Sequence, residues 1–208
     1  STLEYDLTLQ ASAPLGPAAP TGITLVTPVS SPGNNTTPTF NITGVINGYT
    51  VKLYSDNTCS TQVGTSVSGG TDVDITTGAL TAGSYTLYAT QTDLTPTESG
   101  CSTANIAYVL DTTLPSVTGE VNDAVETASK TWSWGCSETC TYQYVIDQNP
   151  GTNPSSGYGA TATATQNTGS GTYYIHIQAK DTAGNESAVV HYSAVLNNVP
   201  APTGITLV

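Results

Sequence analysis

The chain has 208 residues, of which 9% are charged, and 15 Asp and Glu against three Lys and Arg give a formal net charge of −12. A surface so poor in Lys and Arg does not neutralise phosphates, so nucleic acid is not expected as a partner. An anionic membrane surface is disfavoured for the same reason, and no run approaches the ~18 apolar residues of a membrane span, so membrane insertion is not expected either.

The composition favours many short strands over long helices. The chain contains 20 Gly and 12 Pro, residues that punctuate strands with tight turns. Its length suits one or two domains. The four cysteines suit an oxidising compartment, so we expect an extracellular protein whose Cys residues are disulfide-bonded.

Residues 1–19 are expected to be an orphan strand followed by a Pro-rich linker. In LEYDLTLQ, alternation places four large side chains on one face, and they are Leu3, Tyr5, Leu7 and Leu9. The segment precedes ASAPLGPAAP in the way that NIAYVL and VVHYSAVL precede their own linkers. It therefore resembles the last strand of a preceding domain, or a strand donated to another subunit.

Two domains are predicted, one over residues 20–113 and one over residues 114–199. The predicted strands of the first are GITLV, TPTFNIT, YTVKLYS, QVGTSVS, TDVDIT, GSYTLYAT and NIAYVL. Those of the second are SVTG, KTWSWG, TYQYVID, GATATATQ, GTYYIHIQA and SAVVHYSAVL. About seven strands in ~90 residues is typical of an immunoglobulin-like β-sandwich.

The two halves also match each other. GSYTLYATQTDLTPTES at residues 83–99 aligns without a gap with GTYYIHIQAKDTAGNES at residues 171–187. Both begin with Gly-x-Tyr and then alternate, as a half-buried strand does. We interpret Tyr85 and Tyr173 as tyrosine corners, in which the hydroxyl ties the strand to the preceding loop.

The stretch PTGITLV occurs at residues 20–26 and again at residues 202–208. The second copy, with Ile205 and Leu207 on its apolar face, is predicted to be the first strand of a next repeat, so residues 200–208 belong to a following domain. Unpaired strands need a partner. The expected partners are therefore adjacent repeats or neighbouring copies of the same chain.

GYTVKLYSDNTCSTQVG, CSTANIAYVLDTTLPSVTG, KTWSWGC and YYIHIQAKDTAGNESAVVHYSAVL together resemble bacterial Ig-like repeats of very large surface proteins. The resemblance covers nearly all of residues 20–200. It implies an all-β fold of two tandem immunoglobulin-like β-sandwiches joined by short Pro-rich linkers. It also implies a place in stalks, adhesins or extracellular fibres on a bacterial cell surface, with no catalytic residue carried over.

Each domain contains one pair of cysteines. A disulfide between Cys59 and Cys101 would close a long loop, and one between Cys136 and Cys140 in GCSETC would close a small ring. Zinc is disfavoured because neither pair has a histidine nearby.

The aromatic residues Trp132, Trp134, Tyr142 and Tyr144 alternate on two neighbouring strands of the second domain. Buried, they would supply the apolar load that a small sandwich needs. Exposed, they would form a platform for glycans, so a glycan-binding module that recognises cell-surface glycans or proteins of a host or prey is the alternative function.

No enzyme is expected. The only histidines are His176 and His191, and both are predicted to be surface residues on strands, with His176 pointing away from the buried face. No cofactor is predicted apart from calcium, which Asp93, Asp111, Asp147 or Asp181 would hold between domains. The sequence thus favours a non-enzymatic repeat unit of an extracellular stalk, fibre or filament, assembled end to end through its terminal strands.

Overall fold

The computed structural model describes residues 16–198 and divides the chain into two compact units, Ser1–Asp111 (domain 1) and Thr112–Val208 (domain 2). The division falls two residues before the predicted boundary. The predicted assembly residues lie outside the described residues; they are Leu3, Tyr5, Leu7, Leu9, Ile205 and Leu207.

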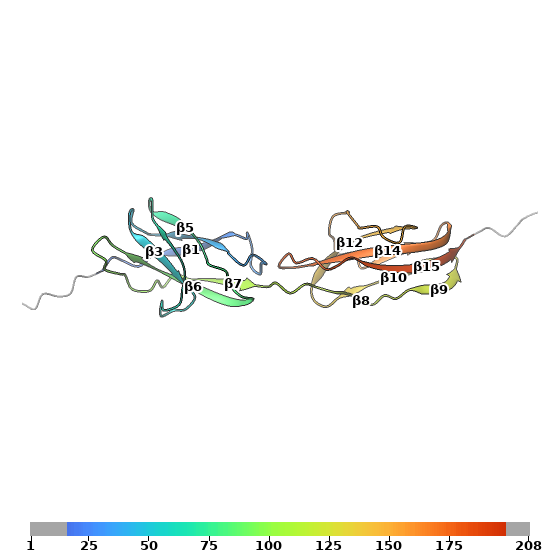
Figure 1. Cartoon of the computed structure of the whole chain (residues 1–208), viewed down its shortest axis with the longest axis horizontal. Coiled ribbons are helices and arrows are strands. Elements are labelled where there is room, and N and C mark those ends of the chain that lie inside the picture. The colour runs from blue at the N-terminus through green and yellow to red at the C-terminus, as the bar shows by residue number, and fades with distance from the viewer. Residues whose placement is uncertain (1–15, 199–208) are drawn as a thin grey trace, which may run out of the picture. The chain divides into compact units, whose positions relative to one another are not determined.

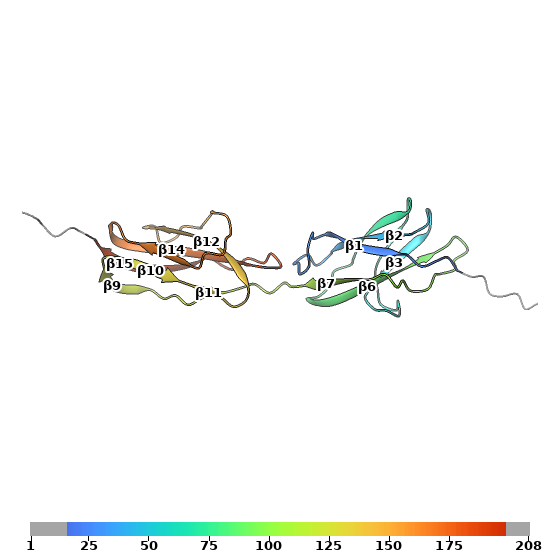
Figure 2. The same ribbon diagram turned by 180° about the vertical axis from the view of Figure 1, so that it is seen from behind.

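Domain 1 is an all-β sandwich of seven strands, and each was predicted (Figure 1). They are β1 (Gly22–Thr27), β2 (Thr39–Thr43), β3 (Thr50–Tyr54), β4 (Gln62–Val67), β5 (Asp72–Thr76), β6 (Gly83–Thr92) and β7 (Ile106–Leu110). One sheet has the order β1-β2-β5 and the other the order β4-β3-β6-β7, with antiparallel pairing throughout. Figure 2 shows β1 beside β2 in the first of these sheets.

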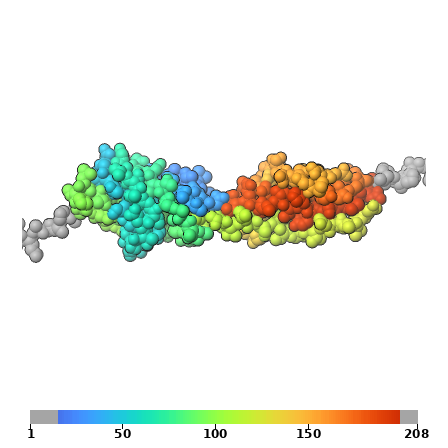
Figure 3. All heavy atoms as spheres, in the orientation of Figure 1, coloured from blue at the N-terminus to red at the C-terminus, as the bar shows by residue number. Residues whose placement is uncertain are grey.

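Over its described residues, 112–198, domain 2 contains eight strands. They are β8 (Val117–Thr118), β9 (Asp123–Thr127), β10 (Lys130–Ser133), β11 (Gly135–Cys136), β12 (Cys140–Asp147), β13 (Thr163–Gln166), β14 (Ser170–Asp181) and β15 (Val190–Asn197). The main sheet has the order β12-β14-β15-β9, and β10-β13 and β11-β8 form two short sheets. In Figure 3 the bands of β12, of β14 with β15, and of β9 lie side by side on the surface.

Strand β9 was not predicted. Its sequence DAVET has no apolar alternation, and its Val125 is exposed. The strand forms because it pairs in parallel with β15, at Ala194–Asp123 and Leu196–Thr127. Strand β9 is therefore held by the backbone of its neighbour and contributes no large side chain to the core.

The core of domain 1 is built from alternate residues of both sheets. Its fully buried side chains include Phe40, Ile42, Val51, Leu53, Ile75, Leu87, Tyr108 and Leu110. The ring of Phe40 meets that of Tyr108 edge to face, with centroids 6.0 Å apart. The Tyr108 hydroxyl donates to the Asn35 carbonyl at 2.9 Å, so this buried polar group is satisfied.

Two tryptophans dominate the core of domain 2. Trp132 and Trp134 pack with Ile175, Ile177, Ala194 and Leu196. Tyr142 and Tyr144 of β12 pack against this cluster, and their ring centroids lie 6.1 Å and 5.2 Å from that of Trp134.

The internal repeat at an offset of 88 residues is reproduced in the hydrogen bonds. Ser99 Oγ accepts a bond from the Gln91 amide at 3.0 Å, and Ser187 Oγ accepts one from the Ala179 amide at 2.9 Å. In both domains, therefore, an amide near the end of the long strand, β6 or β14, donates to a serine hydroxyl instead of to the carbonyl of a neighbouring strand. The two hairpins share a local design as well as a strand pattern.

We expect Trp132→Ala to destabilise domain 2 by about 3–5 kcal/mol, because it removes the largest fully buried side chain of that core. Trp132→Phe should cost less. The indole N–H of Trp132 has no hydrogen-bond partner among the described residues, so its loss leaves no partner unpaired. Both tryptophans lie in domain 2, so urea unfolding followed by Trp134 fluorescence reports on that domain. Equal midpoints for the two variants would contradict the cavity argument.

Candidate functional site

The aromatic cluster is part of the core, and the glycan-platform interpretation of Trp132, Trp134, Tyr142 and Tyr144 is wrong. Trp132 is 0% exposed and Trp134 is 5% exposed, while the two tyrosines are half-buried against them. A sugar-binding platform must present ring faces to solvent. The sequence could not distinguish these alternatives, because alternation tells which side chains share a face but not which face is covered.

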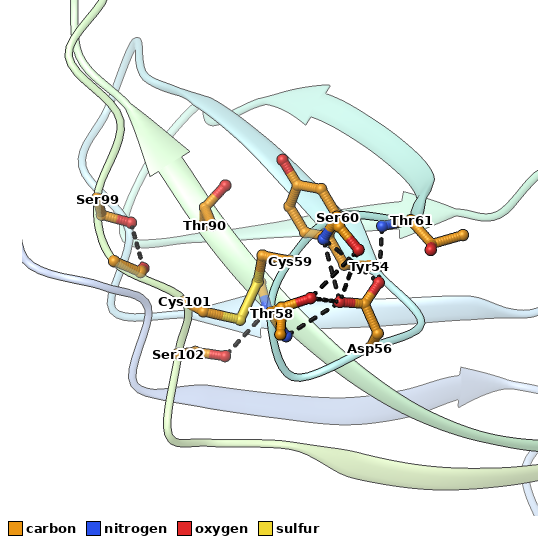
Figure 4. Close-up of a disulfide and its surroundings, with 12 residues drawn as sticks. Tyr54, Asp56, Thr58, Cys59, Ser60, Thr61, Thr90, Ser99, Cys101 and Ser102 are labelled. Carbon is orange, nitrogen blue, oxygen red and sulfur yellow. Dashed lines mark hydrogen bonds between the residues drawn. A yellow bond between two sulfur atoms is a disulfide. The ribbon is translucent and has the colours of Figure 1, made fainter.

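Both expected disulfides are present. Cys59–Cys101 joins the loop after β3 to the segment before β7, across a separation of 42 residues (Figure 4). In the chain-entropy model, a loop of this length corresponds to about 4 kcal/mol of stabilisation. Cys136–Cys140 spans only four residues, from β11 to the start of β12, and the same model gives about 2 kcal/mol.

Asp56 organises the loop that carries Cys59. Its carboxylate accepts hydrogen bonds from the Thr58 hydroxyl at 2.5 Å, the Thr61 amide at 2.7 Å and the Ser60 amide at 3.1 Å (Figure 4). These bonds, the one from Thr58 above all, hold the pKa of Asp56 well below its usual range. The loop therefore presents Cys59 to Cys101 from a fixed conformation.

A second carboxylate, Glu98, joins three side chains on the outer face of domain 1. It accepts hydrogen bonds from Thr90 at 2.5 Å, from Tyr54 at 2.9 Å and from Lys52 at 3.0 Å. Burial by itself would raise the pKa of Glu98, but these three hydrogen bonds outweigh it and lower the pKa. The charged glutamate thus ties the turn after β6 to β3.

The equivalent position in domain 2 is Glu186, 88 residues further on. Its carboxylate lies 2.7 Å from Lys180 Nζ, which also sits 4.4 Å from the ring centroid of Tyr158. Burial, reinforced by Glu186, raises the pKa of Tyr158 to about 12. The third lysine, Lys130, pairs with Asp123 at 3.3 Å. Each of the three cations of the chain is therefore engaged with a carboxylate of its own domain.

Tyr85 makes the hydrogen bond that defines a tyrosine corner. Its hydroxyl donates to the carbonyl of Thr81, four residues earlier, at 2.7 Å. Tyr173 of domain 2 places its hydroxyl against Gly169, also four residues earlier. A Cβ at Gly169 would lie 2.1 Å from that oxygen, and the residue has a φ of +84°. Only glycine fits there without a shift of the tyrosine.

The calcium candidates within one domain are not brought together. In domain 2, Asp147 lies at the end of β12 opposite Tyr174, whereas Asp181 lies opposite Cys140. Seven residues of strand, about 23 Å, separate those positions. In domain 1, Asp93 follows the end of β6, and Asp111 follows Leu110, which pairs with the start of β6 at Gly83. Asp93 and Asp181 each accept a hydrogen bond from a backbone amide of their own turn, and Gly184 in the second turn has a φ of +96°.

The prediction that both histidines are surface residues is wrong for His176. Its side chain does point away from the sandwich core, but it is 0% exposed. Its Nε2 lies 3.2 Å from Asp147 Oδ1, and its Nδ1 lies 2.5 Å from His191 Nδ1. Strand alternation correctly predicted that the His176 side chain points away from the core. Its burial depends on neighbouring strands and loops that cover it, and these are known only from the tertiary structure.

Sequence reasoning did not identify Asp56, Glu98 or the Asp147–His176 pair as organising residues. A signal existed for Glu98, because Glu and Ser coincide in the two halves at the same offset. Asp56 and Asp147 carried no such signal. Their roles depend on which amides and hydroxyls the fold brings within reach.

No protein-family model matches the sequence, and no curated protein matches it. Among the described residues, no helix is long and apolar enough to cross a membrane. Similar solved structures are multidomain fibronectin-III-like and immunoglobulin-like proteins.

The fibronectin(III)-like modules of Clostridium thermocellum CbhA are 13% identical, with 84% of this chain and 93% of that chain covered and a TM-score of 0.43. The I67–I69 fragment of the titin I-band is 17% identical, with 89% and 66% covered and a TM-score of 0.45. A C-terminal fragment of intimin, solved with the intimin-binding domain of its translocated receptor, is 9% identical, with 86% and 64% covered and a TM-score of 0.41. The sheets described above form the all-β, immunoglobulin-like sandwiches, and no particular adhesin family follows from these likenesses.

Acidification should weaken domain 1 through Asp56. Because the native pKa of this group is lowered, its contribution is present above the unfolded-state value of about 3.9 and is lost as the pH falls below it. We expect Asp56→Asn to lower the melting temperature at pH 7 and the difference from the wild type to shrink at pH 2–3. Calorimetry at several pH values measures this.

Asp74→Asn is the matched control, since Asp74 accepts a side-chain hydrogen bond from Asn41 on an exposed strand face. A difference between Asp56→Asn and the wild type that stays constant over the whole pH range would contradict the role given to the Asp56 charge.

Proposed function

We propose that the chain is a non-enzymatic structural repeat unit of an extracellular stalk, fibre or filament, continued end to end through the strands predicted at residues 3–9 and 203–208. The observation that carries the proposal is the behaviour of the described copy of PTGITLV. In domain 1 this stretch forms β1, whose Ile23 is buried in the core and pairs with Ile42 of β2.

The repeated motif has features that fit a strand packed closely against a neighbour. Gly22 lies so close to β2 that a Cβ would come within 2.4 Å of Thr43 Oγ1. Pro20 is buried just before the strand begins. The second copy carries the same residues as Pro202 and Gly204. We therefore expect it to need a partner strand like β2, supplied by a following domain.

The sequence at residues 3–7 supports the other half of the proposal. In β7 the inward residues are Ile106, Tyr108 and Leu110. Leu3, Tyr5 and Leu7 repeat this order of an aliphatic residue, a tyrosine and a leucine at the same spacing. A strand of this kind belongs at the end of a domain, directly before a linker.

Of the two modes of joining, the described domains favour continuation within one polypeptide. Over residues 16–198, each domain already has its own last strand in place, paired with β6 or β14. On its other side, β7 bridges to Gly33 and β15 pairs with β9, both in parallel. A strand donated by another subunit would therefore have to add at a sheet edge instead of completing either domain.

The parallel contacts also suit a load-bearing role. Gly33 lies in the first third of domain 1 and bonds to both neighbours of Leu110, with N–H···O distances of 3.0 Å to Val109 and from Asp111. Pulling an early and a late segment of one domain in opposite directions loads such parallel hydrogen bonds together. The disulfide between Cys59 and Cys101 then limits how far an opened domain can extend.

Native material tests the proposal directly. An antibody against residues 20–199 should recover filaments visible by electron microscopy, and a denaturing gel of boiled material should show a product far larger than the 21.3 kDa of this chain. A band near 21 kDa after boiling, with larger species before boiling, would indicate strand donation between subunits. Dispersed particles whose mass stays near 21 kDa in both gels would overturn the proposal.

Force spectroscopy should resolve the disulfide as an extension limit. Reduction should lengthen the chain released by domain 1 by about 140–150 Å, because 42 residues enter the extended segment. Domain 2 is the internal control, since its disulfide spans four residues and frees only about 13–14 Å. Equal release from domain 1 before and after reduction would show that the Cys59–Cys101 bond does not limit extension.

A further inference from the structure

The outer face of the sheet β12-β14-β15-β9 carries the two histidines of the chain. His176 of β14 and His191 of β15 are direct cross-strand partners in the antiparallel register. Their Nδ1 atoms lie 2.5 Å apart, and the ring centroids are 4.8 Å apart with an interplanar angle of 70°. Two imidazole nitrogens thus converge on one point.

Asp147 orients His176 through the ring nitrogen that does not face His191. The Asp147 carboxylate accepts hydrogen bonds from the Thr152 hydroxyl at 2.6 Å and from the Asn149 amide at 2.8 Å. A carboxylate oxygen accepts hydrogen bonds, so the 3.2 Å contact between Asp147 Oδ1 and His176 Nε2 suits a ring that keeps its N–H on Nε2.

With its Nε2 bonded to Asp147, His176 turns its Nδ1 toward His191 Nδ1, 2.5 Å away. The buried ring of His176 is further oriented by Tyr174, which lies nearly parallel to it with a centroid distance of 6.2 Å. His191 is exposed. The His176 ring is thus held in one orientation, while the exposed His191 side chain is free to change its position.

We propose that His176 and His191 bind a divalent transition-metal ion through their Nδ1 atoms, with Asp147 as the outer-sphere carboxylate that orients His176. A ligating histidine that donates its other ring N–H to a carboxylate is the usual arrangement in metal sites. Imidazole ligands suit copper, nickel and zinc, and affinity for such sites peaks at Cu²⁺.

Binding requires a small and balanced rearrangement. Metal–nitrogen bonds of about 2.0–2.1 Å place two ligand nitrogens about 2.9–3.4 Å apart for angles between 90° and tetrahedral. His191 therefore has to move outward by roughly 0.4–0.9 Å from its 2.5 Å contact. Its Nδ1 proton leaves to solvent and a proton is taken at Nε2, so the ring that binds the metal is the Nε2–H tautomer. Water completes the coordination.

The composition of the chain excludes competing imidazole and thiol ligands from the test. There are two histidines in all, and all four cysteines are in disulfides. Any imidazole signature in a metal complex of the folded chain must therefore come from His176 or His191. Calcium would not use this site, because hard cations prefer oxygen ligands.

The experiment titrates the full chain with CuCl₂ by calorimetry and examines the complex by pulsed electron paramagnetic resonance. We expect one Cu²⁺ per chain with two coupled imidazoles. His191→Ala should lose this binding, Asp147→Asn should weaken it by about 10–100-fold, and Asp74→Asn, the carboxylate control in domain 1, should leave it unchanged.

Tryptophan emission and melting temperature measured without metal establish that each variant is folded. His191 is exposed, so its substitution is not expected to unfold domain 2. Cu²⁺ should raise the melting temperature of the wild type but not of His191→Ala. A copper affinity unchanged by His191→Ala, or a spectrum with a single imidazole, would overturn the site. An affinity unchanged by Asp147→Asn would overturn the role of Asp147.

Discussion

Both domains depend on the burial of one face of each long strand against an opposing sheet. In domain 1, Phe40 of β2 meets Tyr108 of β7 across the sandwich. In domain 2, Trp132 and Trp134 take the corresponding position beneath Ile175 and Ile177 of β14. Since small sandwiches bury little surface per residue, each large aromatic carries a substantial share of the stabilisation. This requirement for core volume is why the tryptophans are not available to a ligand.

Carboxylates organise the outer faces that the core leaves exposed. Glu98 and Glu186 occupy equivalent positions and each binds a lysine of its own domain. Asp56 and Asp147 gather amides and hydroxyls from their own loops. With three cations in the whole chain and all of them paired, the excess negative charge is stabilised by neutral donors. A surface of this kind does not present the positive charge that phosphates require.

The same construction connects the fold to the proposed function. A domain that contains its own first and last strands can be repeated along a polypeptide without borrowing from its neighbour. The disulfide in domain 1 joins loops at a separation of 42 residues, which restricts extension more than it alters the core. The histidine pair belongs to the other domain and lies on the sheet face opposite the core of domain 2, so a metal ion bound there would contact no core side chain.

The sequence by itself determined the strands whose apolar residues alternate, the correspondence between the two halves, and the disulfide pairs, because these follow from local periodicity and spacing. It did not determine β9, which pairs with β15 in parallel and is also joined to it by the hydrogen bond from Asn197 Nδ2 to Glu126. Nor did it determine that Trp134 and His176 are buried. Alternation shows which side chains share a face of a strand, but it does not show whether other residues cover that face. Those outcomes were decided by tertiary contacts between residues such as Asp147 and His176, which are 29 positions apart in the chain.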